Sequence, residues 1–544
     1  MNETISVKPK RLGKTACFGS GISKVTLMLI LATAVLLPLI RMMFGISAVD
    51  FSEVFGSPHF FSALKNSLLY TLASTLISVG VAYALAICTV RVDIKFKQIF
   101  SVLLTLPMLI PSISHGTGLI ILFGSNGIIT NLLGLNGNSY IYGAPGIIIG
   151  SVMYAFPVAY IMLADVLRYE DMSVYEASEI LGITGGRAFL RISLPYMKKP
   201  LFAAFFSTFS MIVTDYGVPL RIGGQQKTLS SLMYECAIGK SELGQGAVFG
   251  LILLLPAIVA FAVDLLSKEN QSSAFVKSER LEKKSALRKA IAYAFCIFMV
   301  LFSLLPIAAF VLLSLVESYP NNMTFTLDNY KFILKGDGLD YLKNALLIAF
   351  LTSLVGTAIG FFTSYLTSRM KSPASRVLHL LAISSMAIPG MVLGISYLMT
   401  FAGSAIYGTF FILIMVNTAH FLSSPYLMMY NSFGKMNENL EAVGSTLGIS
   451  RPRMLARVFL PQSIGTLLEM FSYLFVNCMM TISAVAFLAT SSTRPISLMI
   501  KELERSPKLG RIAVVSLLIL FVNIVIKIIV ERLKAVAARK YKKT

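Results

Sequence analysis

The stretch E-A-S-E-I-L-G-I-T-G-G-R-A-F-L-R-I-S-L-P (176–195) returns in altered form as A-V-G-S-T-L-G-I-S-R-P-R-M-L-A-R-V-F-L-P (442–461). Each copy combines a short helical run, a glycine, a basic stretch and a hydrophobic-Leu-Pro exit. Pro195 and Pro461 suit the first turn of a following helix, because the fixed φ and missing N–H of proline cost nothing there. Gly182 and Gly448 suit the end of the short helix, where a positive φ is needed. The chain therefore carries one segment twice, 266 residues apart.

Composition identifies an integral membrane protein. Of the 544 residues, 56% are hydrophobic and only 13% are charged, and the apolar residues come in long runs. A soluble protein is excluded. Crossing the hydrocarbon takes ~20 apolar residues, and the sequence predicts about twelve helical spans, near 25–46, 67–89, 99–122, 144–167, 201–220, 246–266, 290–316, 344–368, 377–401, 406–430, 464–490 and 512–530.

The charge distribution predicts the orientation. The net charge is +21, and with the N-terminus inside, most Lys and Arg fall in cytoplasmic segments, as the positive-inside bias requires. We therefore expect both termini in the cytoplasm and the lysines against anionic lipid headgroups rather than nucleic acid. Both copies of the repeated segment then lie on the cytoplasmic side.

A second pair of matches extends the repeat to the whole chain. L-K-N-S-L-L-Y (64–70) pairs with L-K-N-A-L-L-I (342–348), and L-I-P (109–111) with A-I-P (387–389), both 278 residues apart. Six spans per repeat is an even number, so the halves are parallel. The predicted organisation is a cytoplasmic tail, a first half, a cytoplasmic linker, a second half and a basic cytoplasmic tail, at 1–24, 25–266, 267–289, 290–531 and 532–544.

The repeated segment resembles the EAA loop of binding-protein-dependent ABC importer permeases: Glu-Ala-Ala, three residues, Gly, about nine residues, Ile-x-Leu-Pro. The first copy matches it at Glu176, Ala177, Ser178, Gly182, Ile192, Leu194 and Pro195. The second departs from it, because Ala442 stands at the glutamate position, Val443 and Gly444 follow, and Glu441 comes one residue early. Its remaining matches are Gly448, Leu460 and Pro461.

This resemblance implies the all-helical fold of a type I ABC importer permease. Two copies of an ABC ATPase subunit would dock near 173–189 and 439–455, and an extracytoplasmic binding protein would deliver the solute. ATP and Mg²⁺ would bind the ATPase, with no cofactor or metal on this chain. Glu176, early in its helix, would be open to an ATPase arginine. No catalytic motif emerges from the sequence, so we do not expect an enzyme.

Polar side chains at membrane depth are candidates for a solute path, because they are costly to bury in lipid. T-D-Y-G-V-P-L-R-I-G-G (214–224) places Asp215, Tyr216 and Arg221 beside glycines that permit a helix break. Asp215 could instead pair with Arg221 structurally. The matching stretch 481–490 carries no charge, so the site is expected to be asymmetric. The other candidates are His115, Asn417, His420, Glu469 and Asn477, although buried histidines are often simply satisfied by neighbours.

The fused twelve-span form, together with 214–224, looks like the ferric-iron permeases and their relatives for 2-aminoethylphosphonate. Ferric iron is the first expectation for the solute and 2-aminoethylphosphonate the second, with polyamine, thiamine or sulfate-like solutes behind them. The expected location is the plasma membrane of a prokaryote. An ion-gradient-driven secondary transporter also uses twelve spans and internal repeats, but it would not need two docking segments.

Overall fold

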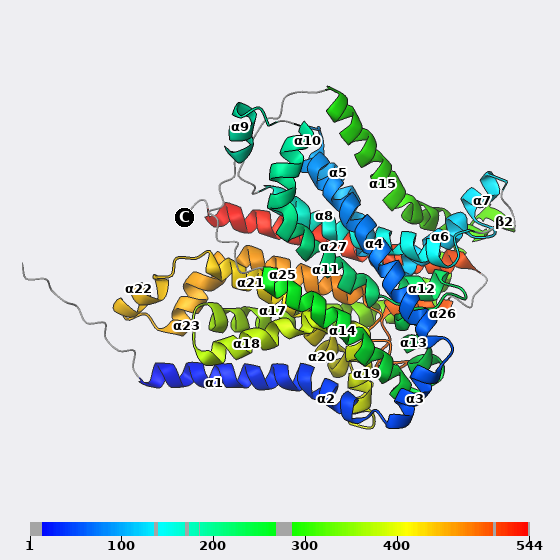
Figure 1. Cartoon of the computed structure of the whole chain (residues 1–544). Coiled ribbons are helices and arrows are strands. Elements are labelled where there is room, and N and C mark those ends of the chain that lie inside the picture. The colour runs from blue at the N-terminus through cyan, green and yellow to red at the C-terminus, as the bar shows by residue number, and fades with distance from the viewer. Residues whose placement is uncertain are drawn as a thin grey trace, which may run out of the picture.

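The computed structural model describes residues 14–134, 140–168, 173–183, 185–267, 286–503 and 508–541, and these are mostly helical (Figure 1). The predicted linker 267–289 lies almost wholly outside the described residues, and the tail 1–24 does so in part. The first half consists of α1 (Lys14–Leu31), α2 (Leu37–Phe44), α3 (Ala48–Gly56), α4 (Phe60–Val90), α5 (Lys97–Thr105), α6 (Ser112–Phe123), α7 (Ile128–Leu132), α8 (Ala144–Arg168), α9 (Ser173–Ile180), α10 (Gly185–Ala188), α11 (Leu194–Val213), α12 (Gly217–Ile222), α13 (Leu229–Tyr234) and α14 (Leu243–Ser267).

The second half begins with α15 and includes one antiparallel strand pair within the described residues. Its elements are α15 (Ala286–Ser314), β1 (Val316–Ser318), β2 (Asn322–Phe325), α16 (Asp328–Lys335), α17 (Gly338–Ser368), α18 (Pro373–Ser384), α19 (Gly390–Phe401), α20 (Phe410–Phe421), α21 (Ser423–Gly434), α22 (Leu440–Thr446), α23 (Arg451–Met454), α24 (Leu460–Gln462), α25 (Ile464–Met480), α26 (Ile496–Leu503) and α27 (Leu509–Tyr541). The predicted tail 532–544 continues α27 as far as Tyr541.

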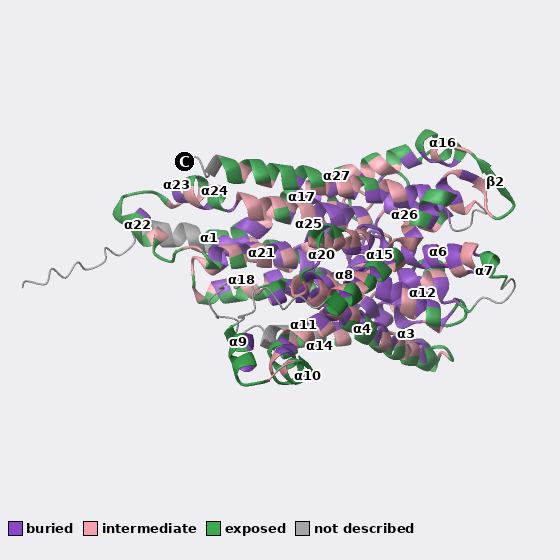
Figure 2. Cartoon of the chain, turned by 90° about the horizontal axis from the view of Figure 1, so that it is seen from above, coloured by how far each residue is buried: buried purple, intermediate pink, exposed green. Residues whose placement is uncertain are grey.

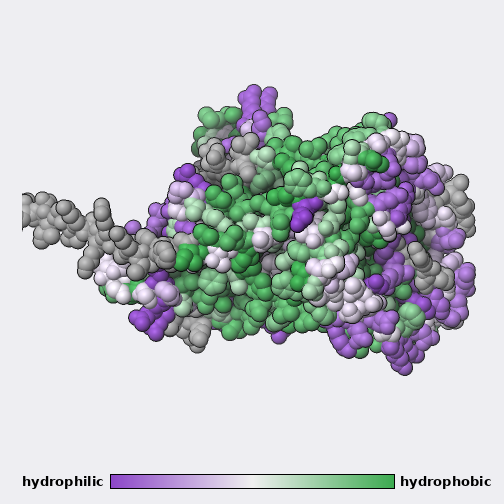
Figure 3. Space-filling model, turned by 90° about the horizontal axis from the view of Figure 1, so that it is seen from below, coloured by the Kyte–Doolittle hydropathy of each residue, from purple (hydrophilic) through white to green (hydrophobic). Residues whose placement is uncertain are grey.

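The apolar exterior fits a membrane protein, since hydrophobic side chains cover the middle of the bundle in Figure 3. Among the described helices, eight are long and apolar enough to cross a membrane, or eleven if each of three bent pairs is one span. The sequence predicted about twelve spans, and some of the predicted spans contain a break. The predicted spans 99–122 and 377–401 break near Pro111 and Pro389, and the latter bends by 106°.

Three more predicted spans need correction. The predicted span 406–430 bends by 53° at Leu422, where α20 gives way to α21. The predicted span 201–220 is α11, which begins earlier, at Leu194, and ends at Val213. The predicted span 464–490 ends at Met480, where turns replace α25. Hydropathy reports composition and not direction, so it passes over breaks inside an apolar run.

Each half is built around its second long helix. In the first half α4 packs against α8 and α11, and in the second half α17 packs against α21 and α25. The buried face of α4 includes a row of small hydroxyl side chains, Ser67, Thr71, Ser74 and Ser78. Small residues let helices approach closely where lipid removes the hydrophobic drive to pack.

The halves exchange their first helices. α1 packs against α17 and α18 and α2 packs against α19, while α15 packs against α4, α5 and α6 (Figure 1). The Lys24 ammonium fixes α1 to the second half by donating to the carbonyl of Met370 at 2.6 Å and to Ser372 Oγ at 2.9 Å. The two halves are therefore interlocked rather than merely side by side.

The two ends of the bundle differ. In both Figure 1 and Figure 2, α9, α10, α22 and α23 lie at one end with the C-terminal end of α27, whereas α7 and β2 lie at the other, where Figure 2 also shows α16. The two repeated segments thus face the same way, as parallel halves require.

Candidate functional site: two docking segments and a cavity between the halves

The first repeated segment begins with the short helix α9. Glu176 and Ala177 are exposed, whereas Ser178 is buried and donates from Oγ to the carbonyl of Tyr175 at 2.8 Å. Gly182 has φ +70°, as predicted. Its N–H bonds to the carbonyl of Glu179, and the next N–H bonds to the carbonyl of Ser178. These two bonds form a Schellman motif, which satisfies the last carbonyls of the helix.

The second repeated segment reproduces this geometry with different residues. Gly448, after α22, has φ +71°. Its N–H bonds to the carbonyl of Ser445 at 3.2 Å, and the N–H of Ile449 bonds to the carbonyl of Gly444 at 2.8 Å. The two segments are therefore equivalent in structure although their sequences have diverged.

A π-helical turn follows the short helix in both segments. Phe189–Ser193 in the first copy and Leu455–Phe459 in the second each join a short helix, α10 or α23, to the next helix. Pro195 and Pro461 lie in the first turn of α11 and α24, as predicted. Ile192 falls inside the π turn. The residue types of these segments do not predict the π turns, because a π turn has no distinctive residue pattern. The repeat itself was the only signal.

The departures of the second copy have a structural reason. A Cβ added at Gly444 would overlap Sδ of Met454, so only glycine fits against this side chain. The equivalent positions in the first copy are Ser178 and Ala188. Compared with the first copy, the second copy thus has the smaller residue at the first of these positions and the larger residue at the second. The second copy is repacked, and its helix is intact.

Glu441 is held within the chain. Its carboxylate accepts two hydrogen bonds from Arg369, from Nε at 2.7 Å and from Nη2 at 2.5 Å. The sequence predicted that this side chain belongs to the docking surface, and the structure places it in the first turn of α22. Ala442, at the glutamate position of the motif, is exposed in its stead.

Both segments expose apolar side chains at this end of the bundle. Ile180 and Leu181 are 87% and 75% exposed, and Leu447 is 69% exposed. Exposed apolar side chains grouped on one face commonly mark a protein interface. Leu181 and Leu447 are equivalent positions of the repeat, and each occupies the same place in its own Schellman motif.

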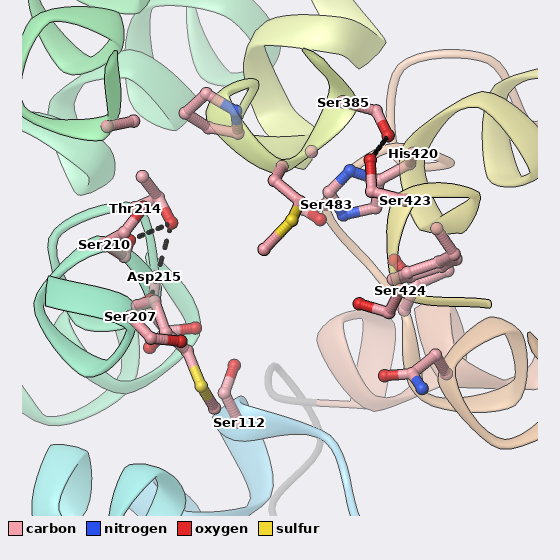
Figure 4. Close-up of a pocket in the computed structure, with 18 of the residues that line it drawn as sticks. Ser112, Ser207, Ser210, Thr214, Asp215, Ser385, His420, Ser423, Ser424 and Ser483 are labelled. Atoms are coloured by element: carbon pink, nitrogen blue, oxygen red, sulfur yellow. Dashed lines mark hydrogen bonds between the residues drawn. The ribbon is translucent and has the colours of Figure 1, made fainter. Parts of the chain in front are cut away.

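A cavity of about 520 Å³ lies between the halves. Figure 4 shows its two walls, with hydroxyl groups facing each other across the space. The first half contributes the polar residues Ser112, Tyr154, Lys199, Ser207, Ser210, Thr214 and Asp215, and the second half contributes Ser385, His420, Ser423, Ser424, Tyr473, Asn477, Thr481 and Ser483.

Helix breaks build both walls. After α11 ends, Asp215 accepts the N–H of Val218 at 3.1 Å and so supports the start of α12. A Cβ on Gly217 would overlap Ser112 Oγ and lie 2.8 Å from the N of Ile113. This glycine lets the break approach the start of α6.

In the opposite wall, glycine stands where the first wall has serine, and serine stands where it has glycine. Gly390, at the start of α19, would carry a Cβ 2.5 Å from Ser483 Oγ and 2.9 Å from His420 Nε2. Gly390 is the repeat equivalent of Ser112, and Ser483 is the equivalent of Gly217. Thr481 stands where the first half has Asp215. The walls are therefore related by the repeat, but only one of them carries the carboxylate.

The cavity brings together four of the predicted path residues, Asp215, Tyr216, His420 and Asn477. The others lie elsewhere. Arg221 donates from Nε to Thr117 Oγ1 at 3.2 Å and is not part of the cavity lining. His115 and Asn417 are fully buried outside the cavity lining. Glu469 pairs with Lys534 at 2.8 Å.

The serine and threonine hydroxyls of the lining, Tyr154, Tyr473 and Lys199 were not predicted. Serine is common in membrane helices, and Lys199 lies near the start of α11, close in sequence to the repeated segment. The usable signal was spacing, since Ser207, Ser210 and Thr214 recur on one helical face. Among the residues that the structure describes, no three His, Cys, Asp or Glu side chains gather as metal ligands would.

Residues 77–268 and 356–537 each match the family described as binding-protein-dependent transport system inner membrane component. These matches cover more than half of the chain, which therefore belongs to this family of ABC importer permeases. The chain is 25% identical over 459 residues to the putative ferric transport system permease protein FbpB 1 of Haemophilus influenzae, with 81% of this chain and 72% of the relative covered.

A second relative is the ferric transport system permease protein FbpB of Actinobacillus pleuropneumoniae. It is 24% identical, and the match covers 81% of this chain and 66% of the relative, just under two thirds of its length. A solved bacterial alginate ABC transporter, in complex with an alginate-bound periplasmic protein, shares 17% identity with a TM-score of 0.36, covering 46% of this chain and 92% of that one. That likeness is too weak to bear on the fold.

Proposed function

We propose that this chain is the complete membrane pathway of an ATP-driven importer. Two ATPase subunits dock on α9 and α22, and a binding protein delivers the solute at the opposite end. One observation carries the proposal: each docking segment runs through its π turn toward a helix that lines the cavity, directly into α11 in one wall, and through α24 and a 74° bend into α25 in the other. ATP hydrolysis belongs to the ATPase subunits and not to this chain.

The connection supplies a mechanism. ATP draws the ATPase subunits together, and α9 and α22 move with them. Because α11 follows its docking segment directly and α25 follows through α24, the motion changes the cavity between two states, one open toward each end. The positive-inside bias orients the docking end toward the cytoplasm, with both termini on that side. The cavity lining on α11 extends from Lys199, near the docking end, to the break at Asp215.

The helix break at Asp215 favours a cationic solute, whereas Lys199 lines the cavity toward the docking end of α11. Asp215 offers a carboxylate among hydroxyl oxygens, and oxygen ligands of this kind suit hard cations. Ferric iron is therefore our first candidate, in keeping with the two relatives named for ferric transport. For 2-aminoethylphosphonate, the second candidate, the same carboxylate would repel the phosphonate group.

The test is reconstitution of this chain with its ATPase and binding protein in proteoliposomes, followed by addition of ferric iron or 2-aminoethylphosphonate. We expect iron to stimulate ATP hydrolysis and to enter the vesicles. Asp215→Asn should lower iron uptake at least about tenfold, the order expected for losing one charge-assisted contact, while the ATPase still copurifies.

Asp165→Asn is the matched control, because this exposed carboxylate pairs with Arg168 outside the cavity lining. It should transport normally. Uptake that proceeds without any ATPase would overturn the importer assignment and favour a gradient-driven transporter. Stimulation by 2-aminoethylphosphonate alone would replace the solute and keep the mechanism.

A further inference from the structure

Two arginines occupy equivalent places at the docking end. Arg91 follows the last residue of α4, and Arg369 follows the last residue of α17, 278 positions later. Both side chains turn toward the docking segment of their own half. We infer that Arg91 and Arg369 are positioning residues that tie each docking helix to the membrane bundle. The contacts themselves do not depend on the proposed function, whereas their role in transport rests on it.

The first tether joins three elements. Arg91 donates from Nη2 to Tyr175 Oη at 2.6 Å and from Nη1 to Ser193 Oγ at 3.0 Å. Its guanidinium carbon also lies 4.8 Å from the centre of the Tyr175 ring. Tyr83, on α4, shares a further hydrogen bond with Ser193. The end of α4 thereby holds both α9, through Tyr175, and the π turn, through Ser193.

The second tether uses the same positions with different chemistry. Glu441 is the repeat equivalent of Tyr175, and Phe459 is the equivalent of Ser193. Arg369 grips Glu441 with two hydrogen bonds, donates to the carbonyl of Asn437 at 2.7 Å and lies 5.5 Å from the Phe459 ring. The side chains of Arg369 and Glu441 are only 5% and 27% exposed, and the hydrogen bonds to Glu441 raise the pKa of Arg369.

The tethers matter because α9 and α22 are short. Helices of seven or eight residues are not stable alone, so contacts with the bundle must hold them. Each docking helix is then joined to two membrane helices, along the chain to α11 or, by way of α24, to α25, and through arginine to α4 or α17. A push on the docking helix reaches both. The bidentate, charge-assisted second tether is the stronger one.

The first experiment uses the full chain alone in nanodiscs and measures amide hydrogen exchange. In Glu441→Gln and Arg369→Gln we expect α22 amides to exchange about tenfold faster, the effect of losing one hydrogen bond to a charged group, while α17 amides stay unchanged. Arg369→Lys, which keeps the charge without the two-armed fork, should be intermediate. In the first half, Tyr175→Phe removes one hydroxyl and should loosen α9.

The matched control is the neighbouring pair Lys371 and Glu438, which joins the same two segments at 3.9 Å but is exposed. Lys371→Gln should leave exchange in α22 at the parent rate. Equal exchange rates in parent and Glu441→Gln would overturn the tether.

The second experiment uses the transporter reconstituted with its ATPase and binding protein, and counts ATP hydrolysed per solute imported. We expect this ratio to rise several-fold in Glu441→Gln and in Tyr175→Phe, with the ATPase still bound, because force is lost between the docking helix and the bundle. An unchanged ratio would overturn the coupling role. Failure of any ATPase to bind the parent chain would instead overturn the proposed function, and the exchange measurement would still decide the tether.

Discussion

Glycines do two different jobs in this molecule. Gly182 and Gly448 adopt positive φ with nothing near an added Cβ, so what they provide is backbone conformation. Gly217 and Gly390 have no such φ and serve instead to leave room for a serine of the facing segment. The same substitution by alanine therefore tests strain at one pair and overlap at the other.

We expect Gly217→Ala to lower the stability of the purified chain more than Gly182→Ala. The first forces Ser112 and the backbone of α6 to shift, at about 1–3 kcal/mol, and the second strains a surface cap by about 1 kcal/mol. Thermal unfolding in detergent measures both. Gly80→Ala in α4 is the control, since its Cβ would meet nothing within 4 Å; equal losses at 80 and 217 would refute the overlap argument.

At the scale of elements, the docking segments show how a repeat can keep a structure and change its residues. The short helix, the Schellman cap, the π turn and the proline that starts the next helix are all retained at an offset of 266, although α11 is continuous and α24 is separated from α25 by a 74° bend. The residues at several positions changed. Ser178 and Ala188 of the first copy correspond to Gly444 and Met454 of the second, and Tyr175 corresponds to Glu441. Divergence that preserves the helix cap and the arginine contact leaves the element intact.

This pairing predicts compensation. Gly444→Ser alone should weaken the packing of α22 on α23 and reduce copurification of the ATPase, because the new side chain overlaps Met454. Adding Met454→Ala recreates the residue pair of the first half and should restore copurification. A double variant no better than the single one would show that the two positions do not share a volume. Ala442→Ser, at an exposed position of the same helix, serves as the control.

At the scale of the molecule, the exchange of first helices joins the halves. α1 and α2 cover the second half, and α15 covers the first. The interlocking adds to the contacts across the cavity, so the halves can rock about the cavity without separating.

We expect the two halves to assemble even when the chain is cut within the predicted linker 267–289. Coexpressed halves should copurify from membranes, because each supplies a helix that packs on the other. Removing residues 1–46 from the first piece should reduce the yield of the complex at least several-fold. Independent recovery of each piece, with no association, would contradict the exchange.

Much of this architecture could be predicted because motif and hydropathy carry it: the two docking segments, their glycine caps, the parallel repeat and the membrane class. The breaks at Pro111 and Pro389 lie inside predicted spans, since the hydropathy of an apolar run is the same whether or not the run changes direction. The exchange of α1 and α15 was invisible, because lipid-facing and protein-facing surfaces are both apolar. Arg91 and Arg369 could have been found by aligning the halves at an offset of 278.

The exchange also sets an order of events during synthesis. α1 leaves the ribosome first, yet the surfaces that cover it, on α17 and α18, are made more than three hundred residues later. Until then α1 sits in the bilayer with lipid for its neighbour, and Lys24 has not met the carbonyl that it will bind. The earliest helix of this chain is one of the last to find its place.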